Sequence, residues 1–122
     1  MIRRIVAVAA LATSLGVTAC APASLFEWGT YEQSLYAYSE NPENREVYQL
    51  SLEQAIERGR SRNAVAPGLL AELGYLHMEA GEKAEAVKCF EEERERFPES
   101  APLMNRVIAS LTGSAATAGA SN

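Results

Sequence analysis

The chain has 122 residues, of which 48% are hydrophobic and 22% are charged, and its formal net charge is −5. This length suits one small domain. All 16 acidic residues are Glu, and there are only one His and two Cys. A Ser-His-Asp triad and a zinc site built from about four Cys and His ligands are therefore excluded. Nucleic-acid binding is not expected of an acidic chain, because neutralising phosphates requires a basic surface.

Residues 1–19 have the organisation of a secretory signal peptide. Arg3 and Arg4 form a short basic start, and an apolar run interrupted only near its end follows from Ile5 to Leu15. The run is shorter than the roughly 20 apolar residues that span a bilayer. We interpret it as a cleaved signal peptide, with a buried core helix as the alternative.

The signal peptide ends in Val17-Thr18-Ala19-Cys20, which resembles the bacterial lipobox. In that motif the Cys thiolate accepts diacylglycerol, small residues admit the peptidase, and the new amino group is usually acylated, with palmitate as the expected chain. Cys20 is therefore the predicted lipidation site. Ala21 stands where Asp causes inner-membrane retention in enteric-type sorting, so the resemblance implies the outer membrane. A secreted protein cut near Ala19 is the alternative.

Processing would leave a chain with 9 basic and 16 acidic residues, because Arg3 and Arg4 are lost from the 11 basic residues. The mature charge becomes −7 by that subtraction. Lipid on Cys20 would leave Cys89 without an intramolecular disulfide partner. We interpret Cys89 as a packed thiol rather than a reactive one, since buried free Cys is common.

The sequence of residues 20–122 predicts an all-α fold. Residues 20–27 are expected to be a lipidated tether, 28–111 a helical domain and 112–122 a disordered tail rich in Ala, Gly, Ser and Thr. Apolar residues at spacings of three and four predict about five helices. Their expected ranges are 28–39, 42–58, 67–80, 83–97 and 100–111.

Particular residues are expected to begin or end these helices. Asn41 and Pro42 suit the start of the second helix, where Val47, Leu50, Leu52, Ala55 and Ile56 form a broad apolar side. Gly59 suits its C-terminal cap. Arg58, Arg60 and Arg62 would complement the helix dipole there, with a site for an anionic partner as the alternative. Residues 91–96 are expected to be a mostly solvated charged side.

One helical hairpin carries a motif. Gly74, Gly81 and Pro98 have the spacing of the tetratricopeptide signature, together with Leu70, Leu73, His77, Ala86 and Phe90. Gly74 and Ala86 allow the two helices to touch, Gly81 permits a left-handed turn, and Phe90 fills the space between hairpins. Leu70 and His77 replace the usual Trp and Tyr, and Glu93 replaces a small residue. Tyr31, Leu35 and Tyr38 form a degenerate upstream copy at an offset of 39.

Tetratricopeptide arrays usually bind peptides or helices in a groove lined by the first helix of each pair. By that resemblance, the candidate partner-binding residues are Tyr36, Tyr75 and Met78, because aromatic residues and Met suit interfaces. Packing between hairpins is an equally weighted alternative for them. No metal or cofactor is expected.

From Trp28 to Met104 the chain resembles a family of small bacterial lipoproteins catalogued as a domain of unknown function. The shared marks are Tyr31-Glu32, Leu35-Tyr36, Pro67-Gly68, Ala71-Glu72-Leu73-Gly74-Tyr75 and Phe97-Pro98-Glu99-Ser100-Ala101-Pro102. The resemblance implies an envelope lipoprotein with tetratricopeptide-like helices that serves an outer-membrane assembly. It brings no catalytic residues.

Three function classes follow. The leading hypothesis is a non-enzymatic protein–protein interaction module, lipid-anchored to the outer membrane, facing the periplasm and binding another envelope protein such as a lipoprotein of a secretion complex. The alternative is a pilotin-like or structural lipoprotein that localises or stabilises a secretin or channel subunit. An enzyme is the third class and is not expected; it would use His77, Glu79 or Glu82 as acid or base, on a small-molecule substrate that is likewise not expected.

Overall fold

The computed structural model describes residues 24–113. Its elements are five α-helices and two short 3₁₀ helices: α2 (Tyr31–Glu40), η1 (Pro42–Asn44), α3 (Arg45–Arg62), α4 (Leu69–Glu79), α5 (Lys83–Arg96), η2 (Pro98–Ser100) and α6 (Ala101–Thr112). The described residues contain no strand, only an isolated parallel bridge between Glu27 and Val65. The prediction of an all-α fold with about five helices is confirmed. The expected signal peptide, Cys20 and the expected tail beyond Gly113 lie outside the described residues.

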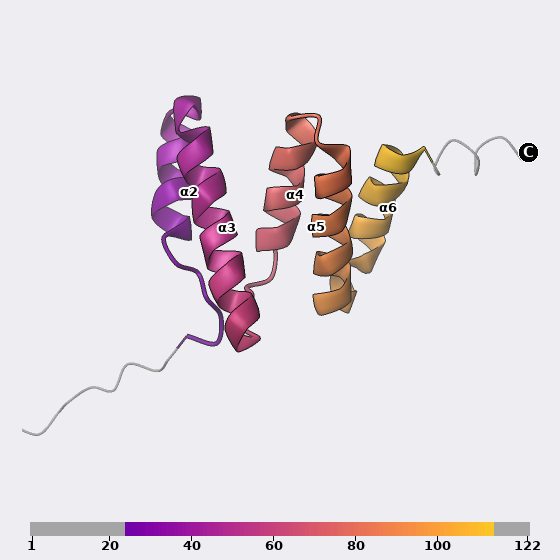
Figure 1. The fold of residues 1–122 in the computed structure, drawn as a ribbon, viewed down its shortest axis with the longest axis horizontal. Coiled ribbons are helices and arrows are strands. Elements are labelled where there is room, and N and C mark those ends of the chain that lie inside the picture. Colours follow the sequence, from indigo (N-terminus) through magenta and orange to yellow (C-terminus); the bar gives the residue numbers. More distant parts are fainter. Residues whose placement is uncertain (1–23, 114–122) are drawn as a thin grey trace, which may run out of the picture.

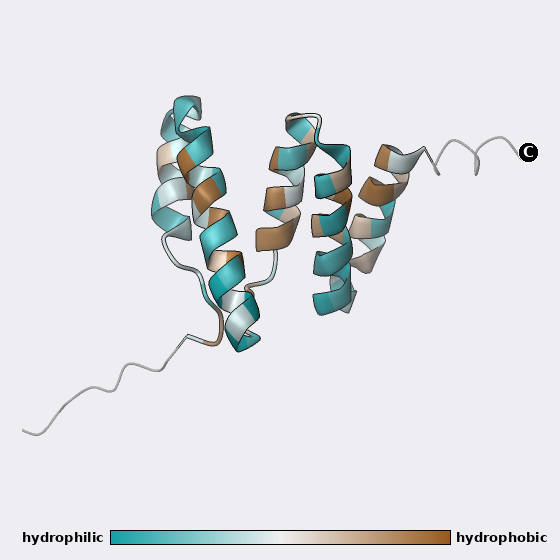
Figure 2. Cartoon of the chain, viewed as in Figure 1, coloured by the Kyte–Doolittle hydropathy of each residue, from teal (hydrophilic) through white to brown (hydrophobic). Residues whose placement is uncertain are grey.

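The helices stand side by side in chain order (Figure 1). The row has an upper and a lower edge in this view. The α2–α3 turn and the α4–α5 turn lie at the upper edge, and the end of α3 and the start of α4 lie at the lower edge. α4 packs on α3 and on α5, and α6 packs on α5. Figure 2 shows a mostly hydrophilic visible face on α5, whereas α4 and α6 carry broad hydrophobic bands.

The first helix begins later than predicted. α2 starts at Tyr31 rather than near Trp28, because Gly29 adopts a φ of +54° that interrupts any helix there. Trp28 lies in the preceding turn, and its ring centroid is 5.7 Å from that of Tyr31. Asn41 and Pro42 begin the short η1 and not the long helix predicted from residue 42. Asn41 Oδ1 accepts a hydrogen bond of 3.0 Å from the Glu43 amide, Pro42 opens η1, and α3 starts only at Arg45.

α3 continues past Gly59, so the predicted cap at Gly59 is wrong. The helix ends at Arg62, and Asn63 supplies the left-handed residue with a φ of 50°. Gly59 is buried, and a Cβ atom there would lie 2.7 Å from the Cα atom of Val65. Glycine is therefore required because the returning chain crosses α3 at this point, not because the helix ends.

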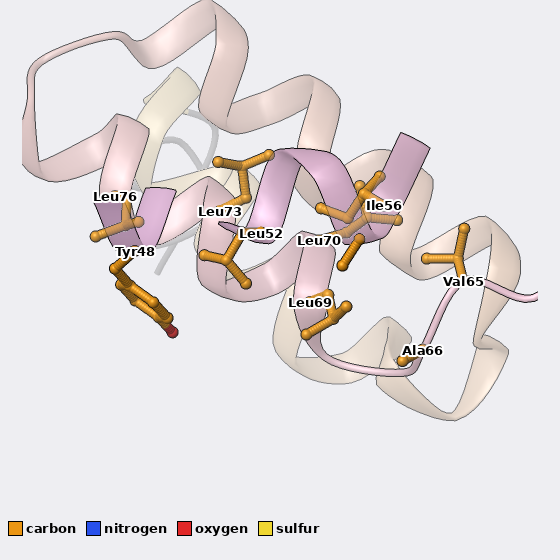
Figure 3. Packing of buried hydrophobic residues seen from close by; sticks show 10 residues of the cluster. Tyr48, Leu52, Ile56, Val65, Ala66, Leu69, Leu70, Leu73 and Leu76 are labelled. Carbon is orange, nitrogen blue, oxygen red and sulfur yellow. The ribbon is translucent and has the colours of Figure 1, made fainter. Parts of the chain in front are cut away.

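A large apolar cluster fills the space between α3 and α4 (Figure 3). Its members are Tyr48, Leu52, Ala55, Ile56, Val65, Ala66, Leu69, Leu70, Leu73 and Leu76. Leu70 and Leu73 of the hairpin motif lie in this cluster, whereas His77 of the same motif is not among its members. Two predicted inward residues of α3, Val47 and Leu50, are instead exposed, because Tyr48 and Ser51 occupy the buried side. The buried positions of α3 then recur at the regular helical spacing.

A second, smaller cluster consists of Ala86, Phe90 and Met104 and joins α5 to α6 and α4. A Cβ atom on Gly74 would lie 2.6 Å from the Phe90 ring, so α4 can approach α5 only through a glycine. The α4–α5 turn uses Gly81 at a φ of +79°. Pro98 follows the end of α5, as predicted, and opens η2. Ser100 stands before α6, but its hydroxyl donates to the Phe97 carbonyl at 2.7 Å instead of capping the helix.

Candidate interaction surface

The structure separates the three predicted partner-binding residues. Tyr36 on α2 is 68% exposed and belongs to neither apolar cluster. Tyr75 and Met78 both pack against the second cluster, and the Tyr75 ring meets Phe90 edge-on with centroids 5.2 Å apart. The structure therefore brings Tyr75 and Met78 together in packing between helices and leaves only Tyr36 with a largely accessible side chain.

Two large apolar residues of α3 join Tyr36 at the surface. Val47 is 60% exposed and Leu50 is 53% exposed. Three positions separate them, so they lie on the same side of the helix. The sequence shows that both are apolar residues of α3. Only their position on the helix, on a different side from Tyr48, Leu52 and Ile56, separates them from the core.

Glu72 joins three helices through its carboxylate. Tyr31 of α2 donates its hydroxyl to Glu72 Oε1 at 2.6 Å, and Tyr48 of α3 donates to Glu72 Oε2. Burial and the neighbouring Glu72 raise the pKa of Tyr31, so its phenol remains a proton donor. Tyr38 stacks on Tyr48 with ring centroids 5.1 Å apart. This cluster holds the first helix pair on α4 and was not predicted from the sequence.

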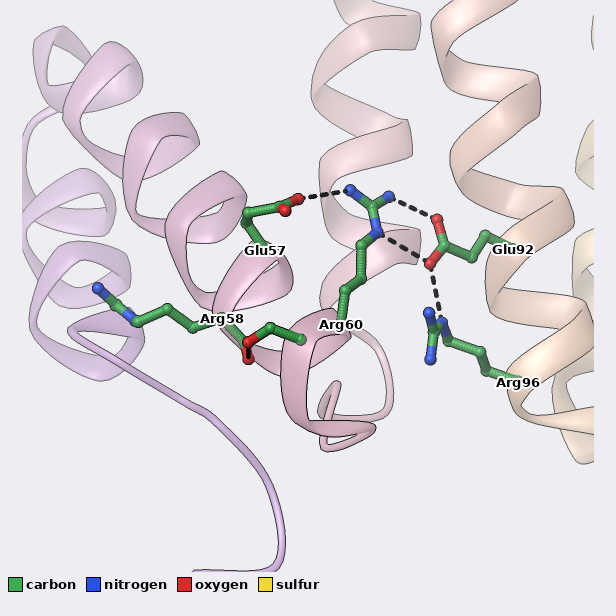
Figure 4. Close-up of polar contacts among 6 residues, drawn as sticks. Glu57, Arg58, Arg60, Glu92 and Arg96 are labelled. Carbon is green, nitrogen blue, oxygen red and sulfur yellow. Dashed lines mark hydrogen bonds and ion pairs between the residues drawn. The ribbon is translucent and has the colours of Figure 1, made fainter.

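Arg60 links α3 to α5 (Figure 4). Its Nη2 and Nε atoms donate to the two carboxylate oxygens of Glu92 at 2.5 and 3.1 Å, and its Nη1 donates to Glu57 at 3.3 Å. Arg96 donates to the same Glu92 at 2.8 Å. The hydrogen bond from Arg60 is the main cause that lowers the pKa of Glu92, and the same bond raises the pKa of Arg60.

The other two arginines of this helix end bind the segment that precedes α2. Arg58 Nε lies 3.6 Å from Glu27 Oε1, and Arg62 donates to Glu27 Oε2. The Glu27 amide also donates to the Ala64 carbonyl at 2.7 Å. All three guanidinium groups thus face carboxylates of this chain, and their place in the last turns of α3 agrees with the predicted role at the helix terminus.

Glu93 is buried, contrary to the solvated side expected for residues 91–96. It is 3% exposed, and its Oε1 atom accepts a hydrogen bond of 2.8 Å from the Gly68 amide at the start of α4. Burial raises its pKa, and the amides of Gly68, Ala71 and Leu70 offset part of that rise. Its Oε2 atom is buried without a hydrogen-bond partner. Glu93 therefore substitutes for the missing side-chain cap of α4, and the only signal was its place where the hairpin motif has a small residue.

The other ionisable or nucleophilic side chains that could take part in catalysis lie in separate places. His77 Nδ1 lies 2.5 Å from Glu82 Oε2 near the α4–α5 turn, and Glu79 is exposed. Cys89 is a free, half-buried thiol whose pKa is raised to about 11 by burial, which agrees with a packed residue. A shallow hollow of about 470 Å³ on α5 is lined by Lys88, Glu91, Glu92, Glu95 and Arg96. Within residues 24–113, no group of three or more His, Cys, Asp or Glu side chains is arranged to hold a metal ion.

Three further findings concern the membrane and the family of the chain. None of the described helices combines the length and apolar character needed to cross a bilayer. One family, described as a domain of unknown function (DUF4810), matches residues 25–107. No curated protein and no solved structure matches the chain.

Proposed function

The chain belongs to the DUF4810 family of domains of unknown function, and from its own residues we propose that it is an outer-membrane lipoprotein acting as a non-enzymatic protein–protein interaction module of an envelope assembly. The anchor would be lipid on Cys20, which follows a signal-like segment and a lipobox-like sequence. The partner would be another envelope protein on the periplasmic side.

The helical part suits such a module. The contact of Gly74 with Phe90, the left-handed turn at Gly81 and the helix stop before Pro98 occur where the tetratricopeptide pattern needs them. Stacked hairpins of this kind present long helix faces to a partner. We therefore class the α4–α5 pair as tetratricopeptide-like.

The observation that carries the proposal is the exposed apolar side chains on the first helix pair. Tyr36, Val47 and Leu50 are all more than half exposed, and α2 and α3 form one end of the helix row (Figure 1). Burying the exposed half of a Val or Leu side chain in an interface gains about 1 kcal/mol, which is roughly half of the gain on full burial. We place partner contact on this pair and not on Tyr75 and Met78, which pack against the second apolar cluster.

Lipid attachment would assist this contact. Confinement to a membrane that also holds the partner raises the effective concentration of both, as a linker does between two binding sites. A surface with few anchor residues would then suffice for association. This is why a domain without a large exposed apolar patch can still serve as a docking module.

The test is crosslinking in intact cells, followed by identification of the captured envelope protein. We expect Val47→Ser combined with Leu50→Ser to abolish capture of a protein that the unchanged chain captures. Leu103→Ser is the matched control, because Leu103 is 50% exposed on α6 at the other end of the row. Equal capture by the double variant and by the control would contradict the proposed surface.

A second arm tests the anchor. Cys20→Ser is expected to release the protein from the outer-membrane fraction while circular dichroism of the purified variant stays helical. Retention of this variant in the membrane would contradict lipid anchoring at Cys20. If the captured protein itself changes location with Cys20→Ser, the pilotin-like alternative is favoured over simple docking.

A further inference from the structure

The segment before α2 is fixed to the lower edge of the helix row, at the end of α3. Phe26 packs against the larger apolar cluster, and Glu27 pairs with Arg58 and Arg62 at the end of α3. The Glu27–Val65 bridge adds a backbone attachment. In Figure 1 the described chain enters beside this end of α3, far from the α2–α3 and α4–α5 turns.

The length of chain between Cys20 and Phe26 limits how the domain can stand on a membrane. These two residues are six positions apart, which spans at most about 22 Å when fully extended. α3 has 18 residues and is therefore about 27 Å long. With lipid on Cys20 held at the surface, an upright domain can touch the membrane only with the end that carries Phe26.

The side chains at this end suit a lipid surface. Leu25 is 83% exposed, and the side chains of Arg58 and Arg62 are 51% and 61% exposed. An apolar side chain beside guanidinium groups matches the boundary between acyl chains and anionic headgroups. Residues 57–63 carry three Arg and one Glu, and with Glu27 the net charge of this end is +1.

The upper edge of the row, on the opposite side, has the wrong charge for such a surface. The segments 40–46 and 79–85 form its two turns. They hold six Glu and only Arg45 and Lys83 as basic residues, a net charge of −4. Anionic headgroups would repel this end.

We propose that the end formed by Leu25, Glu27 and the last turn of α3 lies against the anionic lipid surface of the membrane, with the acidic turns pointing away from it. This inference rests on the proposed lipid anchor at Cys20. The ion pairs of Glu27 with Arg58 and Arg62, which we call the clamp, then hold the anchored segment against α3. They thereby determine which end of the domain faces the membrane. Tyr36, Val47 and Leu50 stay accessible from the side.

The experiment uses the full lipidated protein reconstituted into phosphatidylethanolamine and phosphatidylglycerol vesicles. Single cysteines for a fluorophore are placed by Ser61→Cys at the clamp end and by Ala80→Cys at the acidic end, in a Cys89→Ala background. Lipids with nitroxide headgroups quench labels near the surface. We expect several-fold stronger quenching of the label at position 61 than at position 80. Equal quenching, or stronger quenching at position 80, would overturn the inference.

Flotation with the vesicles is measured first, so that two failures are distinguishable. A protein that does not float contradicts the lipid anchor and hence the proposed function. A protein that floats with equal quenching overturns the orientation alone.

Clamp variants test the mechanism. Arg58→Gln combined with Arg62→Gln should leave flotation intact and reduce the difference between the two labels toward none. Arg60→Gln is the matched control, because it removes a charge at the same helix end without touching Glu27 and should preserve the difference. A difference that persists unchanged in the double variant would exclude the clamp.

Discussion

α4 is held on its two sides in different ways. On the α5 side, Gly74 lies directly against the buried ring of Phe90, a contact that depends on shape, and Glu93 adds a hydrogen bond to the Gly68 amide at the start of α4. On the α3 side, an apolar cluster is accompanied by hydrogen bonds from Tyr31 and Tyr48 to Glu72, and Arg45 donates to the Leu76 carbonyl at 2.5 Å. A contact made by shape should be sensitive to the volume of its side chains. A contact that includes polar groups should be sensitive to the loss of a hydrogen-bond partner.

The largest expected effect is on the α5 side. Phe90→Ala removes a fully buried ring and leaves a cavity beside Gly74, so we expect a loss of about 3–5 kcal/mol in the free energy of unfolding. Urea unfolding of the soluble domain measures it. Leu103→Ala, at an exposed site on the neighbouring helix, is the control and should change stability by about 0.5 kcal/mol or less. A loss for Phe90→Ala as small as the control would mean that this contact is not close-packed.

On the α3 side, removing one polar partner should cost less. Glu72→Ala leaves the hydroxyls of Tyr31 and Tyr48 without their acceptor, for an expected loss of about 1–3 kcal/mol. Combining Glu72→Gln with Tyr48→Phe in a double-mutant cycle isolates the interaction between the two side chains, which should exceed about 0.5 kcal/mol. Tyr36→Phe, on the exposed face of α2, is the control. Strictly additive losses would show that the Tyr48–Glu72 hydrogen bond contributes no stability of its own.

The two sides of α4 also differ in how well they could be predicted. The α5 side follows a sequence motif in which the small residue, the turn glycine and the large aromatic stand at fixed spacing. These positions interact within one hairpin, so local spacing determines which residues meet. Gly74 allows the close approach of α4 and Gly81 takes the left-handed turn, as expected, whereas Phe90 lies against Gly74 inside the hairpin as well as in a cluster with Met104 of α6.

The α3 side depends on contacts between residues distant in sequence, which helical periodicity does not reveal. Glu72 meets tyrosines 41 and 24 positions earlier. The same holds on the α5 side for Glu93, whose carboxylate meets the Gly68 amide 25 positions earlier. Gly59 was misassigned as a helix end because a glycine is needed equally for a close crossing. Val47 and Leu50 were assigned to the core because composition gives the width of an apolar side but not its rotation toward α4.

The contribution of Glu93 to the free energy of unfolding should increase as the pH falls. Burial raises its pKa in the folded state, so the folded chain binds that proton more tightly than the unfolded chain. Its contribution is therefore least favourable at neutral pH and improves as the pH falls through the raised pKa toward the ordinary Glu value of about 4.3.

Two variants test this contribution. Glu93→Gln keeps an acceptor for the Gly68 amide without a charge, so the difference in unfolding free energy from the unchanged chain should shift in favour of the unchanged chain as the pH falls from 7 toward 5. Glu93→Ala leaves the amide without its acceptor and should cost about 1–2 kcal/mol near pH 5 and less at pH 7, because the contribution of Glu93 itself falls as the pH rises. A pH-independent difference for Glu93→Gln would contradict a raised pKa.

The smallest expected effect, with the opposite pH dependence, concerns Arg60 and Glu92. Their side chains are partly exposed, so Arg60→Gln should cost only about 0.2–1 kcal/mol, and less in high salt. Arg60 lowers the pKa of Glu92, so this contribution is present above the unfolded Glu pKa and is lost as the pH falls through the lower folded value. Arg60→Lys is the informative control, because Lys keeps the charge but cannot reproduce the two-pronged contact with the carboxylate. If Arg60→Lys and Arg60→Gln lose the same stability, geometry rather than charge joins α3 to α5 at this point.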